Sequence, residues 1–325
     1  MTEIAYEVKE IAGKGRGLVA TRDIAVGECI LEEEALLQCQ QSVLAVPATI
    51  ASYVVLWHFT ESWLHWMVLG IVAFVVCFKL APLCWVHTMG SEKKRKYFTL
   101  SGAAGFSDFY LTSLAIFRVN VLQGTDGAVC RLAGLINHSC APNGSHIWHA
   151  DKRREFVYAQ KPIKSGEEIT IGYIDLFEEY AERRKRLSKY YGFDCTCPTC
   201  SMPGPLRDVS DGNRTNAAFL SDMILVKAQR GGSEAEEALE YVNQVLGFID
   251  AEFGTESVHK TGVCWDAHDI TKQMGDEKLA KEWGEKACRH GCLTKGPTHP
   301  DVCMMKATLK DALTDPMLSS RAAGG

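Results

Sequence analysis

The chain carries little net charge. It has 325 residues, with 35 Lys and Arg against 40 Asp and Glu, which gives −5 at pH 7. This balance supplies no overall basic field, so it excludes binding to nucleic acid through bulk charge alone. Basic runs occur locally, at 93–96 and 183–186, but such runs usually form solvated faces. We therefore expect no direct, sequence-specific contact with nucleic acid.

We also expect no secretory signal. The first ten residues, MTEIAYEVKE, are polar and acidic and lack the apolar core of a signal peptide. We therefore expect the protein in the nucleus or the cytoplasm, where thiols stay reduced. The 13 Cys then do not indicate a disulfide framework, and closely spaced Cys indicate a metal site.

One apolar segment differs from the rest. Residues 63–86, WLHWMVLGIVAFVVCFKLAPLCWV, are interrupted only by His65 and Lys79. The segment is long enough to cross a bilayer, and Trp residues lie near its ends as in an interfacial belt. Three interpretations stay open: a transmembrane helix, a helix inserted in a soluble domain, and translated intron. We expect membrane association only under the first.

Two parts of the chain predict short strands joined by Gly turns, at 5–37 and 155–173. Their turns share a form, RDIAVGE at 22–28 and KPIKSGE at 161–167. In each we expect the Ile to point inward and the Gly to take the strained turn position. The pattern predicts a small all-β core that is split by an insertion.

The second half changes character. From about 213 to 310 the apolar residues recur at helical spacing, and short Gly turns separate several segments. Antiparallel helix pairs of the tetratricopeptide type and a plain helical bundle both stay open, because no strict period is visible. A further helix is predicted over 175–190, with Asp175 as N-cap and Glu178 at its third position.

The stretch CTCPTC supplies three thiols within six residues, at Cys195, Cys197 and Cys200. Structural zinc takes four ligands in a tetrahedron, with Zn–S bonds of about 2.3 Å. Cys140 is the best candidate for the fourth, because Pro and turn residues hold it in the loop LINHSCAPN. The alternative is a reduced Cys cluster without metal.

The turn GKGRG, at 13–17, is a weaker signal. It is typical of a tight hairpin, although its backbone amides could also approach a ligand. It lacks the Walker lysine pattern and does not precede a helix, which disfavours binding of a nucleotide phosphate.

Four stretches follow one another along the chain: GKGRGLVATRDIAVGE, LINHSCAPN, GEEITIGYIDL and YYGFDCTCPTC. Together they resemble the SET domain of protein lysine methyltransferases, and most of all the SMYD-type branch and its fungal relatives. In that branch an insertion splits the SET core. The resemblance covers residues 4–38 and about 115–203, and the MYND zinc finger of the SMYD proteins is absent.

The resemblance implies an α+β fold: a mainly-β SET core with a pseudoknot-like NHSC loop and a post-SET zinc site, followed by an all-α region. The implied parts are 1–38 as the N-terminal part of SET, 39–114 as the insertion, 115–178 as the C-terminal part of SET, 179–203 as the post-SET segment and 204–318 as the helical region.

The resemblance also implies site residues. S-adenosylmethionine would be bound by Lys14, Gly15, Arg16, Asn120, Asn137, His138, Tyr191 and Phe193. The active-site tyrosine would be Tyr173, and the zinc ligands would be Cys140, Cys195, Cys197 and Cys200. The loop 135–146 would then serve two sites, with Asn137 and His138 toward the cofactor and Cys140 toward the metal.

These residues suit methyl transfer to lysine. Displacement at a sulfonium needs alignment and a neutral amine. The reference pKa of lysine is about 10.4, and an apolar channel beside a cationic sulfonium lowers it. Tyr173 can orient the amine. We therefore expect an S-adenosylmethionine-dependent protein-lysine N-methyltransferase acting on a histone or another protein. The alternatives are a catalytically silent SET scaffold that binds partners through its helical region, and a membrane-tethered adaptor.

Overall fold

The computed structural model describes residues 4–38, 86–87, 89–100, 109–122 and 128–314. They form two compact units. The first comprises Met1–Glu32, Ile136–His149 and Phe156–Gly325, and the second Glu33–Leu135 and Ala150–Glu155. The proposed transmembrane segment lies outside the described residues except for Val86. In the part of the chain that is described, no helix is both long and apolar enough to cross a membrane.

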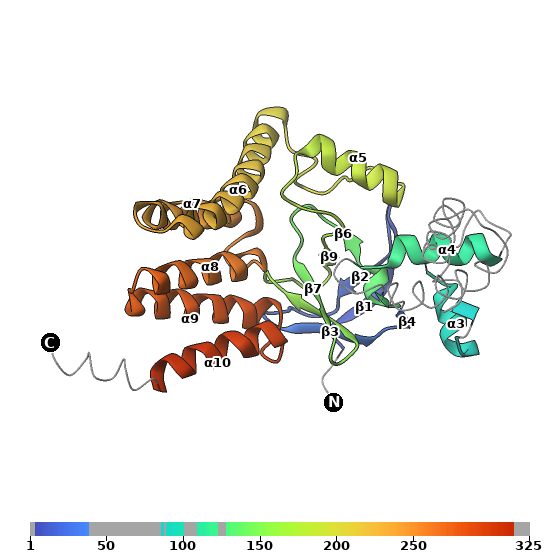
Figure 1. The fold of residues 1–325 in the computed structure, drawn as a ribbon. Coiled ribbons are helices and arrows are strands. Elements are labelled where there is room, and N and C mark those ends of the chain that lie inside the picture. The colour runs from blue at the N-terminus through green and yellow to red at the C-terminus, as the bar shows by residue number, and fades with distance from the viewer. Residues whose placement is uncertain (1–3, 39–85, 88, 101–108, 123–127, 315–325) are drawn as a thin grey trace, which may run out of the picture. The chain divides into compact units, whose positions relative to one another are not determined.

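Small sheets form the β core, as predicted (Figure 1). The largest has the order β1-β2-β9-β6, in which β6 runs parallel to β9 and the other neighbours are antiparallel. Its strands are β1 (Tyr6–Ile11), β2 (Gly15–Ala20), β9 (Glu168–Ile171) and β6 (Asn137–His138). A second sheet contains β3 (Cys29–Glu34), β8 (Arg154–Ala159) and β7 (Gly144–His149), and β4 (Leu37–Gln38) pairs with β5 (Ala128–Val129).

The two similar turns meet in the core. The amide of Ile24 donates to the carbonyl of Ile163 at 2.8 Å, and the amide of Ile163 donates back at 3.0 Å. Both Ile side chains are buried. Gly27 and Gly166 have φ of 81° and 85°, in the left-handed region that favours glycine. The predicted inward Ile and strained Gly are therefore confirmed in both turns.

The helical C-terminal region is also confirmed. It contains α6 (Gly204–Arg230), α7 (Ser233–Phe253), α8 (His259–Gln273), α9 (Glu277–Thr294) and α10 (Pro300–Thr314). The helices α6 and α7 pack as one pair and α8 and α9 as another, and α7 to α10 stack side by side (Figure 1). The pairs begin at residues 204 and 259, a wider spacing than the period of about 34 residues in tetratricopeptide repeats.

The second unit contains α3 (Ser91–Tyr97), α4 (Phe109–Asn120) and the 3₁₀ helix η1 (Ala133–Leu135). The carboxylate of Glu33 accepts hydrogen bonds from the backbone amides of residues 131–133, at 2.8–3.0 Å. It thereby satisfies the free amides at the start of η1.

The predicted helix over 175–190 begins later than expected. The helix is α5 (Tyr180–Tyr191), and Asp175 is not its N-cap. The Asp175 carboxylate instead accepts from the amide of Phe177 at 2.9 Å, as in an Asx turn. The amide of Tyr180 donates to Asp211 of α6 at 2.9 Å. A carboxylate 31 residues away thus caps this helix, which local sequence cannot reveal.

The paired turns generate a stability prediction. Replacing Ile163 by Ala should lower the free energy of unfolding by about 2–5 kcal/mol, because a fully buried side chain leaves a cavity. The control is Val8→Ala on β1, where the side chain is 43% exposed, and there we expect a loss of less than about 1 kcal/mol. Urea unfolding followed by circular dichroism measures both. Equal losses would contradict an anchoring role for the turns.

Candidate active site and metal centre

The NHSC loop enters the main sheet as β6. Asn137 and His138 lie opposite Thr170 and Ile171 of β9, and the Ser139 amide donates to the Ile171 carbonyl at 3.0 Å. This parallel pairing places the loop beside the end of β9, and from there the Asn137 side chain reaches the GKGRG turn at the Arg16 carbonyl. The chain then turns toward Cys140.

A polar cluster forms where β6 meets the GKGRG turn. The side-chain amide of Asn137 donates to Glu168 Oε1 at 2.9 Å and to the Arg16 carbonyl at 3.3 Å. Lys14 Nζ forms an ion pair with Glu168 Oε2 at 2.6 Å. A Cβ on Gly17 would come within 2.7 Å of the Asn137 amide nitrogen, so only glycine permits this approach. The structure thus brings Lys14, Arg16 and Asn137 together.

Gly15 lies between Lys14 and Arg16 with φ of 74°, which explains glycine at that position of the turn. Glu168, which links Lys14 to Asn137, was missed by sequence reasoning. It belongs to GEEITI and directly follows the turn predicted at 161–167. The signal that could have found it is the alternation in EITI, the sequence of β9. Glu168 precedes the buried Ile169 there and so belongs to the strand.

The expected aromatic residues gather around Tyr173. The Tyr173 hydroxyl donates to the Ile136 carbonyl at 2.5 Å, and the Tyr191 hydroxyl donates to the Tyr173 carbonyl at 3.0 Å. The Tyr173 ring centroid lies 4.9 Å from that of Tyr191, 6.4 Å from Phe193 and 5.3 Å from His138. Burial raises the pKa of Tyr173 and of Tyr191, so both phenols stay protonated at neutral pH.

His138 connects this aromatic group to the cysteines. Its Nδ1 lies 3.0 Å from the backbone amide of Tyr173, which can only donate. Nδ1 therefore accepts, and the ring proton of the neutral imidazole belongs on Nε2. Nε2 lies 3.4 Å from Cys140 Sγ, so it donates to that sulfur. One imidazole thus fixes the position of the Tyr173 backbone and of the Cys140 thiol.

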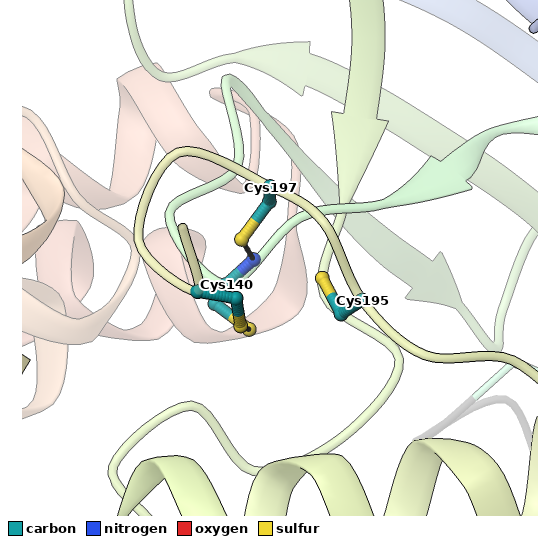
Figure 2. A group of neighbouring side chains, drawn as sticks. Cys140, Cys195 and Cys197 are labelled. Carbon is teal, nitrogen blue, oxygen red and sulfur yellow. Dashed lines mark hydrogen bonds between the residues drawn. The ribbon is translucent and has the colours of Figure 1, made fainter. Parts of the chain in front are cut away.

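The four predicted cysteines meet in one cluster, and Figure 2 shows three of them, Cys140, Cys195 and Cys197. The sulfurs of Cys140, Cys195, Cys197 and Cys200 all lie within 4.8 Å of one another, and all four residues are buried. Cys140 comes from the loop after β6, and the others follow α5. The Cys140 and Cys200 sulfurs are 3.5 Å apart, and the Cys140 amide donates to Cys197 Sγ at 3.5 Å.

This donor set fits a zinc ion. Tetrahedral Zn–S bonds of about 2.3 Å place the sulfurs about 3.8 Å apart, which agrees with the observed spacing. The hydrogen bond with Cys140 lowers the pKa of Cys195 and lowers that of Cys197 to about 5, whereas hydrogen bonding with Cys195 raises the pKa of Cys140, and the pKa of Cys200 is also raised. Thiolate is the form of cysteine that binds metal. A bound metal would therefore have to displace the protons of Cys140 and Cys200.

Asn120 is not one of the residues of the clusters described above. It ends α4 in the second unit, where it is buried and its side-chain amide donates to the Ile116 carbonyl at 2.8 Å. Its expected contact with the cofactor stays a prediction.

Part of the chain matches a known family. The family model for the SET domain matches residues 15–174. The histone-lysine N-methyltransferase set5 of Schizosaccharomyces pombe is 29% identical over 219 residues, which is 67% of this chain and 57% of that protein. Human histone-lysine N-methyltransferase SMYD1 is 40% identical over 120 residues, or 32% of this chain and 24% of that protein.

Among solved structures, the SET domain of LSMT bound to lysine and AdoHcy covers 96% of this chain and 88% of that chain, with 14% identity and a TM-score of 0.31. A score this low carries no argument, so the family assignment rests on the sequence matches. The chain spans less than two thirds of the length of the two curated relatives. It contains a SET domain and is homologous to the SET5 and SMYD histone-lysine methyltransferases.

Proposed function

We propose that this chain is an S-adenosylmethionine-dependent protein-lysine N-methyltransferase. The observation that carries the proposal is the hydrogen-bonded unit of Tyr173, His138 and Cys140, built on the same loop as Asn137. The relatives named histone-lysine methyltransferases support a protein lysine as substrate, on a histone tail or on another protein. A nuclear or cytoplasmic location is part of the same proposal.

The polar cluster suits the methionine part of the cofactor. That part is a zwitterion, and the cluster offers both signs: the Lys14 ammonium for a carboxylate, and Glu168 with the Arg16 carbonyl for an ammonium. Tyr191 and Phe193 supply aromatic walls, and Asn120 is proposed as a further contact. When bound, S-adenosylmethionine supplies a methyl group on an electrophilic sulfonium.

Tyr173 would orient the substrate amine. Its hydroxyl donates its proton to the Ile136 carbonyl, so toward an amine N–H the oxygen would act as the acceptor. Burial raises the pKa of Tyr173, so the residue serves to align the amine and not to remove its proton. The rings of Tyr191 and Phe193 beside it tolerate a cationic product.

Zinc held by the four cysteines would be structural. It would tie the loop after β6 to the segment after α5, and through His138 it would hold Tyr173 in place. The division into SET parts, insertion, post-SET segment and helical region belongs to this proposal. The scaffold alternative gains no support, because Asn137, His138 and Tyr173 lie together as an active site requires.

Tyr173 generates the direct test. Tyr173→Phe should lower methyl transfer about 100-fold or more, because one preorganised hydrogen bond to the reacting amine is lost. The matched control is Tyr190→Phe, on α5 and 57% exposed, which should leave the rate unchanged. Transfer of radiolabelled methyl groups to histones and to cell lysate measures both variants. If both variants matched the unsubstituted protein, Tyr173 would not be the active-site tyrosine. If the unsubstituted protein were also silent, the enzyme proposal would be wrong.

Cys140 tests the link between metal and cofactor. Cys140→Ser should lower zinc content and also weaken binding of S-adenosylhomocysteine by about 10-fold, because His138 loses the sulfur that holds it. The control is Cys303→Ser, at an exposed cysteine outside the cluster. Elemental analysis reports zinc, and calorimetry reports cofactor affinity. Unchanged affinity after zinc loss would show that the two sites are independent.

A further inference from the structure

A buried ion pair in the helical region reaches the segment that follows Tyr173. Arg214 of α6 is fully buried, and its Nε donates to Glu252 Oε2 of α7 at 2.9 Å. Its Nη1 donates to the backbone carbonyl of Leu176 at 2.5 Å. The ion pair thus belongs to the helices, but one of its hydrogen bonds ends on the turn that directly follows the proposed active-site tyrosine.

A network of hydrogen bonds holds this arginine in place. The Glu252 carboxylate also accepts from the Ser210 hydroxyl at 2.5 Å and from the Asn213 side-chain amide at 3.0 Å. The guanidinium carbon of Arg214 lies 4.8 Å from the ring centroid of Phe253, a contact that favours a cation. Buried charge-assisted hydrogen bonds of this kind impose one geometry, and loss of one partner leaves the other charge uncompensated.

Leu176 connects this network to the backbone at Tyr173. Its side chain is buried, and a Cβ on Gly172 would come within 3.1 Å of Leu176 Cδ1. Gly172 directly precedes Tyr173 in the chain. The Leu176 side chain therefore packs against the backbone from which the Tyr173 side chain projects. The residue whose carbonyl binds Arg214 is thus also the residue that confines this backbone.

The next residue of the turn is attached to the helices as well. The ring centroid of Phe177 lies 5.4 Å from that of Phe253 at the end of α7, and 4.8 Å from that of His259 at the start of α8. On its other side, the Tyr173 amide is held by His138 Nδ1 at 3.0 Å. Tyr173 is therefore supported twice, by the NHSC loop at its amide and by the helical region through the turn that follows it.

We propose that Arg214 is a positioning residue for methyl transfer: held by Glu252, it fixes the Leu176 carbonyl and thereby the direction of the Tyr173 side chain. This inference rests on the proposed methyltransferase function, and it gives α6 and α7 a part in the reaction itself. The hydrogen bonds of Arg214 within the described residues go to Ser210, Glu252 and Leu176, and not to the polar cluster proposed for the cofactor. Loss of Arg214 should therefore slow methyl transfer and spare cofactor binding.

The test uses the full chain and replaces both members of the ion pair. Arg214→Met alone would leave a buried carboxylate without its counter-charge, whereas Arg214→Met with Glu252→Met removes both charges and should cost little stability. The Leu176 carbonyl still loses its donor. With histones as substrate, we expect kcat to fall about 10–100-fold, while KM and the affinity for S-adenosylhomocysteine change by less than about threefold.

The matched control is a second ion pair between the same two helices. Arg230 of α6 and Glu234 of α7 are 3.1 Å apart, and their side chains are 62% and 34% exposed. Arg230→Met with Glu234→Met should change kcat by less than about twofold, because exposed ion pairs contribute little.

A second measurement reports the position of Tyr173 without any methyl transfer. With 3-fluorotyrosine in place of Tyr173, the fluorine-19 resonance should shift in the Arg214 and Glu252 double variant and stay unchanged in the control. If the double variant does not fold, as judged by circular dichroism, Arg214→Lys replaces it. Lysine keeps the charge but lacks the planar fork that binds Glu252 and the Leu176 carbonyl together, so the same two changes are expected.

Two outcomes would overturn the proposal in whichever variant folds. One is an unchanged kcat, and the other is an unchanged fluorine resonance, with or without a loss of rate, since Arg214 would then only stabilise the helices. A chain that transfers no methyl group even when unsubstituted would count against the methyltransferase proposal, and the fluorine resonance alone would then decide whether Arg214 positions Tyr173.

Discussion

The described site depends on one imidazole. His138 accepts a hydrogen bond from the Tyr173 amide on one side and approaches the Cys140 sulfur on the other. Because Nδ1 accepts from the Tyr173 amide, the ring proton of the neutral imidazole is on Nε2. Nε2 is therefore the donor to the Cys140 sulfur. The parallel pairing of β6 with β9 makes this geometry available, because it sets Asn137 and His138 directly beside the strand that leads into Tyr173. The proposed catalytic residue and the proposed metal therefore share a support.

Burial of the cysteine cluster shapes the start of the helical region. Four sulfurs within 4.8 Å of one another cannot all become thiolates in a buried place without positive charge nearby. The cysteines belong to the same buried core as Ala217 and Ile224 of α6, and Asp211 of α6 also caps α5. The helical region therefore shares its core with the cysteine cluster.

Sequence reasoning succeeded where residue type or a repeated form identifies the partners. Three cysteines in six residues need a fourth ligand, and a loop rigidified by Pro offered Cys140. The repeated turn form predicted Ile24 and Ile163 as inward residues. It failed where neither partner belongs to such a pattern: Glu168 binds Lys14 across 154 residues, and Asp211 sets the start of α5 across 31. Such contacts leave no periodicity or spacing to read. The contact of Asn120 with the cofactor stays a prediction. A transmembrane helix at 63–86 stays one of three interpretations of that segment.

The charges around Tyr173 bear on how methyl transfer would proceed. Tyr173 is kept neutral by burial, and the charge of Glu168 raises its pKa further. Glu168 itself is paired with Lys14 at 2.6 Å and accepts from Asn137, and in the proposal it also faces the ammonium of the cofactor. His138 uses both ring nitrogens in fixed hydrogen bonds. None of these three described groups is free to act as a general base. In the proposed reaction the lysine would therefore not give its proton to any of these three groups, and their contribution would be alignment beside the aromatic rings.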